Sequence, residues 1–358
     1  MREHDGRGAD PRDATAGSRS RYALVERVAA LAPADCSVLR DRYAVVVGCG
    51  ALGSAVAEHL VRGGVGRVGV VDRDVVEPRN LAHQVLYTER DAAAGRLKAE
   101  AAARRLRTLN AGCAVEGVVA DCAPDNVLRL TAGADVVVDG VDNVESKLLL
   151  NDAAVANGTP LVHGGCAGTE GAVLAVLPGV THCLRCLWPE PGGAAARRTC
   201  ETRGLLPGTA AVVAALQATE ALKLLLGLGA DALSGLVRID TWDAALRRVP
   251  LPPFAAVSGS CPACGKRDFG YLRGRHTTAA RELCGEDTVL LSAPAGGLDL
   301  ECLRERHRGN ATLRARPGCV QLDVDGCRIV AFSSGRTLIH GAGGMNRARA
   351  LYARHVSG

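Results

Sequence analysis

The amino-acid sequence predicts an α/β protein with a mostly parallel sheet, followed by a small C-terminal α+β domain. Short apolar, β-branched runs alternate with helical patterns from residue 43 to residue 240, and the first run leads directly into a glycine-rich turn. A pattern of shorter strands begins after residue 278. At 358 residues the chain can hold two or three domains, and a composition of 47% hydrophobic but only 3% aromatic residues favours a core of Val, Leu and Ala.

The glycine-rich turn lies between a strand and a helix. Residues 43–47 form the predicted strand, Gly48-Cys49-Gly50-Ala51-Leu52-Gly53 follows, and residues 55–61 have a helical pattern. The three glycines permit the turn, let the main chain approach a phosphate, and let helix and strand pack closely. The free N–H groups at the helix start favour an anion. Asp72 ends the next predicted strand, residues 68–71, where an acid that binds ribose is expected. The sequence therefore predicts a Rossmann-like nucleotide site with these ligand-binding residues: Gly48, Gly50, Ala51, Gly53, Asp72 and Asp74.

Further strands and helices follow in the order expected for such a sheet. We predict helices at residues 92–109 (with Lys98 near its start), 125–130, 146–157 and 209–228, and strands at 114–119, 136–141, 160–162, 171–177 and 237–240. Ligands of open α/β sheets bind beyond the carboxyl ends of the strands. Asp142 and Asn143, which follow the strand at 136–141, are therefore placed beside the same phosphates.

The fourteen cysteines are of two kinds. Ten are scattered singly and are expected to act as small hydrophobic residues. The other four form two C-x-x-C pairs, Cys183 with Cys186 and Cys261 with Cys264, which supply the four thiolates of a tetrahedral zinc site. A redox dithiol would not explain both pairs. Since the pairs are far apart in the chain, we expect a structural zinc knuckle that ties two distant segments together and takes no part in catalysis.

Charge and hydropathy argue against several classes of protein. The net charge is +5, but the basic residues are nearly all Arg and are spread along the chain, which is poor evidence for nucleic-acid binding. The most apolar predicted helix contains Gln217, Glu220 and Lys223, so no membrane span is predicted. The N-terminus lacks the apolar core of a secretory signal, and we expect a cytoplasmic protein. Residues 1–20 have no periodicity and are expected to be a disordered tail.

The polar residues around the turn favour phosphate chemistry over hydride transfer. A dehydrogenase has no use for a lysine and carboxylates at the phosphate end of the site. Nucleotidyl transfer needs them, because its catalysis rests on positioning and on charge neutralisation by Lys or Arg and by Mg²⁺ held on a carboxylate. Lys98, one of only four lysines, is the expected phosphate cation, Asp142 the Mg²⁺-binding acid and Asn80 a polar clamp. Attack of a carboxylate on the α-phosphate of ATP would leave an acyl-adenylate and pyrophosphate.

From about residue 21 to residue 270 the chain resembles the ThiF/MoeB/HesA adenylyltransferases, bacterial relatives of ubiquitin-activating enzymes. The resemblance is carried by Arg21-Tyr22, residues 48–53, Asp72-Arg73-Asp74, Asn80-Leu81, residues 95–98, Val141-Asp142-Asn143, Leu150-Asn151-Asp152, both cysteine pairs and residues 216–223. It implies ATP and Mg²⁺ at residues 48–53, Asp72, Asn80, Lys98 and Asp142, a structural Zn²⁺ on the four cysteines, and a homodimer. It also implies a substrate, the C-terminal Gly-Gly carboxylate of a small ubiquitin-like sulfur carrier protein, which is adenylated before sulfur is delivered for thiamin, molybdopterin or another sulfur-containing product.

Two positions depart from the family pattern. Where the family usually has a phosphate-binding arginine after Asn-Leu-x, this chain has His83, which is neutral for much of the time near pH 7. Where a second arginine normally follows Arg-Tyr-x and reaches the partner subunit's ATP, this chain has Leu24. Arg79 is the nearest replacement for the first arginine. The alternative is that His83 is a buried, hydrogen-bonded histidine and Arg79 a surface residue.

Cys200 lies where some relatives carry a cysteine on a mobile crossing loop that joins covalently to the carrier. The arginines beside it, Arg197 and Arg198, would lower its pKa and favour the thiolate. Many relatives do not need that cysteine, so an inert loop cysteine is the alternative to a covalent role.

The sequence predicts three segments: the tail at 1–20, a ThiF/MoeB-like ATP-binding adenylyltransferase domain with the zinc site at 21–272, and a small α+β accessory domain at 278–358. In the last we predict strands at 288–292, 320–324, 328–332 and 337–339 and helices at 298–306 and 345–355. Some relatives carry a rhodanese domain here, but no cysteine of this segment opens a rhodanese-like loop. We expect a module for carrier recognition or dimerisation.

Three functions remain open at this stage. The main one is adenylation of a carrier's C-terminus. The second is activation of a peptide's carboxylate or amide in natural-product biosynthesis, and the third is a scaffold of the same fold with altered chemistry, given Leu24 and His83. Dinucleotide-dependent oxidoreduction is disfavoured, because it leaves Lys98, Asp142 and the cysteine pairs unexplained.

Overall fold

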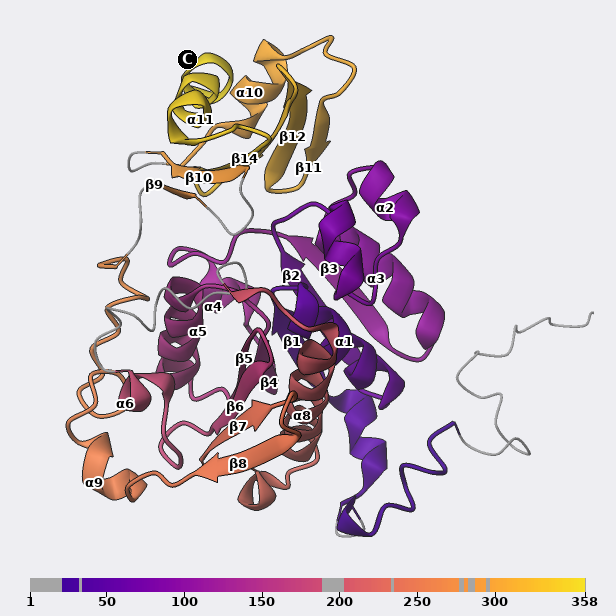
Figure 1. Ribbon diagram of the computed structural model, residues 1–358, viewed down its shortest axis with the longest axis vertical. Coiled ribbons are helices and arrows are strands. Elements are labelled where there is room, and N and C mark those ends of the chain that lie inside the picture. Colours follow the sequence, from indigo (N-terminus) through magenta and orange to yellow (C-terminus); the bar gives the residue numbers. More distant parts are fainter. Residues whose placement is uncertain are drawn as a thin grey trace, which may run out of the picture.

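The computed structural model describes residues 21–31, 34–188, 203–232, 235–276, 280–282, 287–293 and 297–357. The tail predicted for residues 1–20 and Cys200 lie outside the described residues. The fold class is confirmed: the chain forms a mostly parallel eight-stranded sheet and a second, six-stranded sheet toward its C-terminus (Figure 1).

The main sheet has the strand order β3-β2-β1-β4-β5-β6-β7-β8. Its first five strands run parallel and the last three antiparallel. The strands are β1 Tyr43–Val47, β2 Arg67–Asp72, β3 Ala114–Val119, β4 Val136–Asp139, β5 Leu161–Ala167, β6 Glu170–Val176, β7 Leu236–Asp240 and β8 Ala245–Val249. β8 was not predicted, because its three exposed central residues, Leu246, Arg247 and Arg248, give it no apolar alternation.

Helices cover both faces of this sheet. Ala44 and Val46 of β1 join a core with α1 (Ala51–Arg62), α3 (Lys98–Leu109) and α8 (Pro207–Leu225), while Val45 and Val47 join a second core with α5 (Val144–Asn157). Alternate residues of a strand point to opposite faces, which explains the continuous apolar run of β1. The shorter helices are η1 Ala29–Leu31, η2 Cys36–Asp41, η3 Pro78–Ala82, α2 Glu89–Ala93, α4 Val127–Leu130, α6 Leu184–Leu187, η5 Gly229–Asp231 and α9 Phe254–Ser258.

Among the described helices, α8 alone is long and apolar enough to cross a membrane, judged by length and composition. A core helix passes the same test, and half of the relevant window is buried in the protein. Val213, Ala214 and Ala218 of α8 lie in the core against the sheet, which accounts for its apolar character.

The single helix predicted at residues 92–109 is wrong, because the structure has two helices there, α2 and α3. Gly95 has a φ of +53°, outside the helical region. Two residues later, Leu97 pairs with Val75 in an isolated β-bridge. The break makes Lys98 the first residue of α3. Lys98 thus sits at a helix start beside the end of β2 and not within a continuous helix.

The C-terminal sheet is antiparallel, with the order β11-β12-β13-β14-β10-β9. Its elements are β9 Ala280–Glu282, β10 Thr288–Ser292, α10 Leu300–Arg306, β11 Arg314–Arg316, β12 Cys319–Val324, β13 Cys327–Phe332, β14 Arg336–His340, α11 Met345–Tyr352 and the final turn η6 Ala353–Ser357. α10 and α11 pack on one face of this sheet. The other face contacts the main part of the chain through Val75 and Leu97.

Candidate active site

The glycine turn has the geometry that the motif predicts. Gly48 has a φ of +85°, and a Cβ on Gly53 would lie 1.8 Å from the Gly48 carbonyl oxygen, so α1 packs directly on the turn. A Cβ on Gly50, in contrast, would meet only Gln84 Nε2 at 3.9 Å. The space above Gly50 is therefore open, and no side chain caps the N-terminus of α1. An anion such as a phosphate can approach these N–H groups.

Gly140, in the loop after β4, packs against this turn, and the sequence reasoning did not assign it to the site. A Cβ there would lie 2.3 Å from the Gly48 carbonyl oxygen and 2.9 Å from Gly53 Cα. The loop after β4 thus closes onto the loop after β1. The signal in the sequence was a glycine directly between a strand and Asp142.

Asp72 holds the turn through main-chain contacts. Its two carboxylate oxygens accept hydrogen bonds from the N–H groups of Cys49, at 2.6 Å, and Asp74, at 2.7 Å. Burial, the largest influence, raises the pKa of Asp72 above its usual range. The carboxylate predicted to bind ribose therefore also sets the shape of the loops around it.

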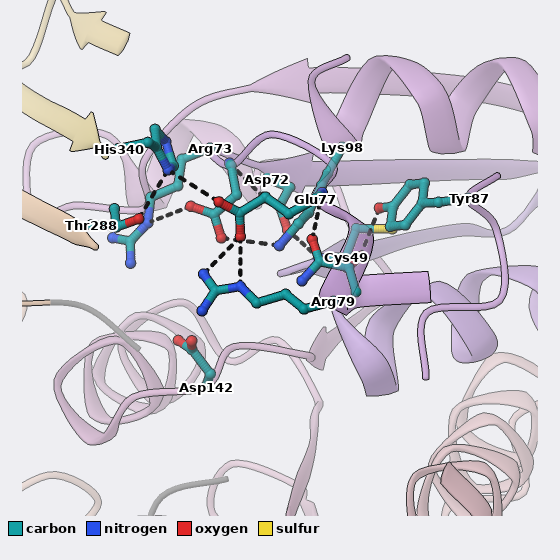
Figure 2. A network of polar contacts seen from close by, with 12 residues as sticks. Cys49, Asp72, Arg73, Glu77, Arg79, Tyr87, Lys98, Asp142, Thr288 and His340 are labelled. Atoms are coloured by element: carbon teal, nitrogen blue, oxygen red, sulfur yellow. Dashed lines mark hydrogen bonds and ion pairs between the residues drawn. The ribbon is translucent and has the colours of Figure 1, made fainter. Parts of the chain in front are cut away.

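Lys98 and Asp74 form a partly buried ion pair. Figure 2 shows Lys98 next to Asp72. Lys98 Nζ lies 3.1 Å from Asp74 Oδ2, and the lysine side chain is only 8% exposed. Burial opposes the charge of Lys98, but Asp74 and Asp72 outweigh it and raise the lysine pKa. Burial likewise works against the charge of Asp74, yet Lys98 and Arg73 hold the pKa of Asp74 below its usual range. The lysine is thus a permanent cation at the end of β2.

The short helix η3 carries the other predicted residues of this loop. Asn80 Oδ1 accepts a hydrogen bond from the N–H of Glu77, which closes a capping box. Arg79 is half exposed, and its guanidinium lies 2.7–2.8 Å from Glu77 Oε2. His83 is partly buried, and burial together with the charges of Lys98 and Arg79 lowers its pKa. At neutral pH His83 is therefore uncharged, while Arg79 keeps its charge on an acidic partner.

Asp142 and Asn143 lie at the start of α5. Asn143 caps this helix by accepting a hydrogen bond from Ser146 N–H at 2.9 Å, and its amide donates to Asp142 Oδ1 at 3.2 Å. Asp142 is exposed and lies apart from the bonded network in Figure 2. Its charge is among those that raise the pKa of Lys98 and Arg73. The structure thus brings Asp142 within electrostatic range of Lys98.

A buried charged cluster lies beneath these loops, and the sequence reasoning did not find it. Lys147 Nζ contacts both oxygens of Asp139, at 3.2 and 3.1 Å, and the carbonyl of Gly164 at 2.8 Å. His163 Nδ1 lies 2.6 Å from Asp139 Oδ2. Burial raises the pKa of Asp139, but Lys147 and His163 pull it below its usual range. The one available signal was Lys147 itself, a lysine kept in an arginine-rich chain.

The four paired cysteines come together as predicted. Their sulfur atoms all lie within 4.8 Å of one another, with separations of 3.9 Å for Cys183–Cys186, 3.6 Å for Cys183–Cys261 and 3.4 Å for Cys186–Cys264. Zinc–sulfur bonds of about 2.3 Å in a tetrahedron place sulfurs about 3.8 Å apart, which these separations match. The four sulfurs therefore fit a structural Zn²⁺ that joins α6 to residues 261–264.

Helix α5 supports the two segments that carry these cysteines. Asn151 Oδ1 accepts a hydrogen bond from the N–H of Leu184 at 2.8 Å, and Asp152 Oδ2 accepts one from the N–H of Tyr271 at 3.0 Å. Burial raises the pKa of Asp152 to about 6. The Leu-Asn-Asp motif noted in the sequence thus positions the two segments that carry the cysteines through these hydrogen bonds.

Comparison with known proteins gives this arrangement a family. The model of the ThiF family matches residues 23–262. The chain belongs to the ThiF family. This ThiF-family chain is 39% identical over 339 residues to a sulfur carrier protein ThiS adenylyltransferase of Bacillus subtilis, covering 94% of this chain and 99% of that protein. It is 40% identical over 232 residues to a sulfur carrier protein adenylyltransferase of Thermus thermophilus, covering 63% of this chain and 83% of the relative.

The solved structures support the same fold. Escherichia coli MccB, in its complex with MccA-N7isoASN, superposes with a TM-score of 0.56 at 22% identity, over 64% of this ThiF-family chain and 68% of MccB. The sequence-based recognition of the family is confirmed, and so is the class of enzyme, an adenylyltransferase. Cys200, for which a covalent role and an inert loop cysteine were both considered, lies outside the described residues. Leu24, in place of the family's second arginine, is 79% exposed.

Proposed function

We propose that this protein uses ATP and Mg²⁺ to adenylate the C-terminal carboxylate of a small ubiquitin-like sulfur carrier protein that ends in Gly-Gly. The named relatives act on sulfur carrier proteins, and one of them matches nearly the whole chain. The observation that carries the proposal is the partly buried Lys98–Asp74 pair beside the open space over Gly50. A permanent cation near open space at a helix start is suited to nucleotidyl transfer.

The steps of the reaction are assigned to the turn at Gly50, to Asp72 and Lys98 beside the end of β2, and to Asp142 at the start of α5. The turn at Gly50 binds the phosphates through main-chain N–H groups, and Asp72 orients the ribose. Lys98 neutralises charge that develops on the phosphates as the carrier's carboxylate attacks the α-phosphate and pyrophosphate leaves. Asp142, exposed at the start of α5, is the carboxylate that would hold Mg²⁺, which supplies further neutralising charge when bound. Asn143 orients Asp142 through its amide.

Arg79, and not His83, is proposed as the replacement for the family's missing phosphate-binding arginine. His83 is uncharged at neutral pH, because burial and the neighbouring cations lower its pKa. Arg79 keeps its charge and is held by Glu77 on the same short helix as Asn80. ATP would have to draw the guanidinium partly away from Glu77, so this cation is weaker than an unpaired arginine.

Other parts of the proposal follow from the family pattern. Zn²⁺ on the four cysteines is a structural tie, Cys200 is a candidate for a covalent link to the carrier, and the protein acts in the cytoplasm as a homodimer. The separate C-terminal sheet supports a division into an adenylyltransferase domain at 21–272 and an accessory domain at 278–358. The sulfur-containing product, thiamin, molybdopterin or another, depends on which carrier the enzyme accepts.

Exchange of labelled pyrophosphate into ATP tests the proposal. We expect exchange that depends on Mg²⁺ and on a carrier ending in Gly-Gly, and that is lost with a carrier lacking the final glycine. Asp142→Asn should reduce exchange by about 10²–10³-fold. Glu305→Gln, a matched loss of an exposed carboxylate on α10, should leave it unchanged. Exchange that requires a short peptide instead of a carrier would favour peptide activation, and no exchange with either substrate would favour a scaffold.

A further inference from the structure

Strand β14 of the C-terminal sheet turns one face toward the nucleotide loops. Leu338 belongs to an apolar cluster with Val75 and Leu97, whereas Ile339, one residue later, packs with α10 and α11. Alternate residues of a strand share a face, so Arg336, Leu338 and His340 all point toward the main part of the chain. Each of the three contacts a segment that carries nucleotide-site residues.

Leu338 contributes the apolar part of this interface. Val75 and Leu97, which it packs against, pair with each other in a β-bridge and are almost fully buried. Val75 directly follows Asp74, and Leu97 directly precedes Lys98. Asp74 and Lys98 are therefore each adjacent in the chain to a residue of this bridge, and both bridge side chains pack against the C-terminal sheet.

Arg336 contributes charge to the same interface. Its guanidinium is about 5% exposed, with Nη1 2.7 Å from Asp121 Oδ2 and Nη2 3.6 Å from Glu145 Oε1. The other oxygen of Asp121 accepts a hydrogen bond from Arg73 Nη1 at 2.5 Å. Arg73 Nε in turn lies 3.6 Å from Asp74 Oδ1. A continuous chain of charges thus leads from β14 to the Asp74–Lys98 pair.

Glu145 and His340 extend these contacts to two further loops. Glu145 lies in the first turn of α5, three residues after Asp142, so Arg336 also contacts the helix start that presents Asp142. His340 Nδ1 lies 3.0 Å from Thr288 Oγ1 and 3.8 Å from Glu77 Oε1 (Figure 2). Glu77 is the residue that holds Arg79. β14 therefore reaches the loops after β2, β3 and β4.

We propose that Arg336 and His340 are positioning residues of the nucleotide site, through which the C-terminal sheet sets the placement of Lys98, Asp74 and Arg79. The inference rests on the proposed function, since it assumes that these loops bind ATP. With Arg336 in place, the charge of Asp121 is shared between two guanidinium groups. Without it, Arg73 alone must neutralise Asp121 and is drawn away from Asp74, which changes the field around Lys98.

Equilibrium binding of ATP to the full-length chain tests this inference, together with KM values for ATP and for the carrier. Arg336→Met should weaken ATP binding by about tenfold to a hundredfold, because the residues that contact ATP remain present but are displaced from their positions. The KM for the carrier should stay unchanged. Arg336→Lys keeps the charge but not the two-pronged contact and should restore part of the affinity. Arg354→Met, at an exposed arginine of the same sheet's helical layer paired with Asp325, is the matched control and should bind ATP like wild type.

Each result separates this inference from the proposed function. If the wild-type protein binds no ATP, the proposed function itself fails. If wild type binds ATP and folded Arg336→Met binds it equally well, or loses ATP and carrier affinity alike, the positioning role is overturned. Should Arg336→Met not fold, His340→Gln decides: we expect severalfold weaker ATP binding with an unchanged KM for the carrier, and wild-type ATP binding would overturn the proposal.

Discussion

Replacing Lys98 with methionine removes one charge from a mostly buried cluster and keeps most of the length of the side chain. Lys98 Nζ lies 3.1 Å from Asp74 Oδ2, and Asp72 also acts on its charge. In the variant, the carboxylates of Asp72 and Asp74 remain with Arg73, whose Nε is 3.6 Å from Asp74 Oδ1. The substitution thus separates the contribution of this ammonium to the reaction from its contribution to folding.

The two contributions have different sizes. Loss of one preorganised charge at the site of developing negative charge should slow exchange by about 10²–10³-fold, or about 2.7–4 kcal/mol. Breaking a fully buried ion pair costs about 3–5 kcal/mol of stability, but the Asp74 side chain is 31% exposed and Arg73 remains, so we expect about 1–3 kcal/mol. A domain with about 5–15 kcal/mol of stability stays folded after this loss.

The stability difference should also depend on pH. Burial works against the charge of Asp74, but Lys98 and Arg73 depress its pKa in the folded protein, so its contribution to stability is present above its unfolded value and is lost as pH falls through the folded value. The gap in unfolding free energy between wild type and Lys98→Met should therefore narrow in acid, below about pH 4.

Pyrophosphate exchange at saturating ATP and carrier measures the first effect, and urea unfolding followed by circular dichroism measures the second. Lys266→Met, the same change at an exposed lysine, should alter neither. A folded Lys98→Met variant that exchanges within about threefold of the wild-type rate would refute the assignment of Lys98 as the phosphate cation.

Four further substitutions test other parts of the site. Gly53→Ala places a methyl group 1.8 Å from the Gly48 carbonyl oxygen and should lower the melting temperature sharply, with a loss of about 3 kcal/mol or more of folding stability. Gly50→Ala should fold normally but weaken ATP binding in a titration, because its methyl group enters the open space proposed to hold a phosphate. Cys261→Ser should remove the zinc measured by metal analysis and lower the melting temperature, because the tie between α6 and residues 261–264 is lost. His83→Arg should raise the exchange rate, most clearly at pH 8, because the low pKa of His83 leaves it uncharged there while arginine is a permanent cation.

Three outcomes would contradict these expectations. Wild-type ATP affinity in Gly50→Ala would place the phosphates elsewhere. A metal-free Cys261→Ser variant with an unchanged melting temperature would remove the structural role of zinc. An unchanged exchange rate in His83→Arg at pH 8 would show that Arg79 already supplies the charge that the family's arginine provides.

Much of the fold could be predicted because its signals are local. The strand predicted at 43–47 has the bounds of β1, and the strand predicted at 288–292 has those of β10. Each is a largely apolar run in which four consecutive residues are buried. The structure does bring together the glycines, Asp72, Asp74 and Lys98. They lie at the carboxyl ends of neighbouring parallel strands or at the start of a helix beside those ends. The four paired cysteines come together, as expected for ligands of one metal ion.

The remaining features depend on contacts between distant parts of the chain. The break before Lys98 is set by a bridge to Val75, which the local helical pattern cannot reveal. Asp139 and His163 are 24 residues apart and meet only because β4 and β5 are adjacent. A strand was predicted at 337–339, but the sequence could not show that Arg336 contacts Asp121 across the interface with the main sheet. The sequence located the candidate nucleotide loops, and the structure shows which contacts hold them.

Intact-mass analysis of the carrier protein tests the central claim most directly. After incubation with enzyme, ATP and Mg²⁺, followed by rapid quenching, a carrier ending in Gly-Gly should appear with one added AMP at its C-terminus. The adduct should be absent with the Asp142→Asn enzyme and with a carrier that lacks the last glycine. A carrier that gains no AMP while the folded enzyme binds ATP would contradict the account of this protein as a carrier-adenylating enzyme.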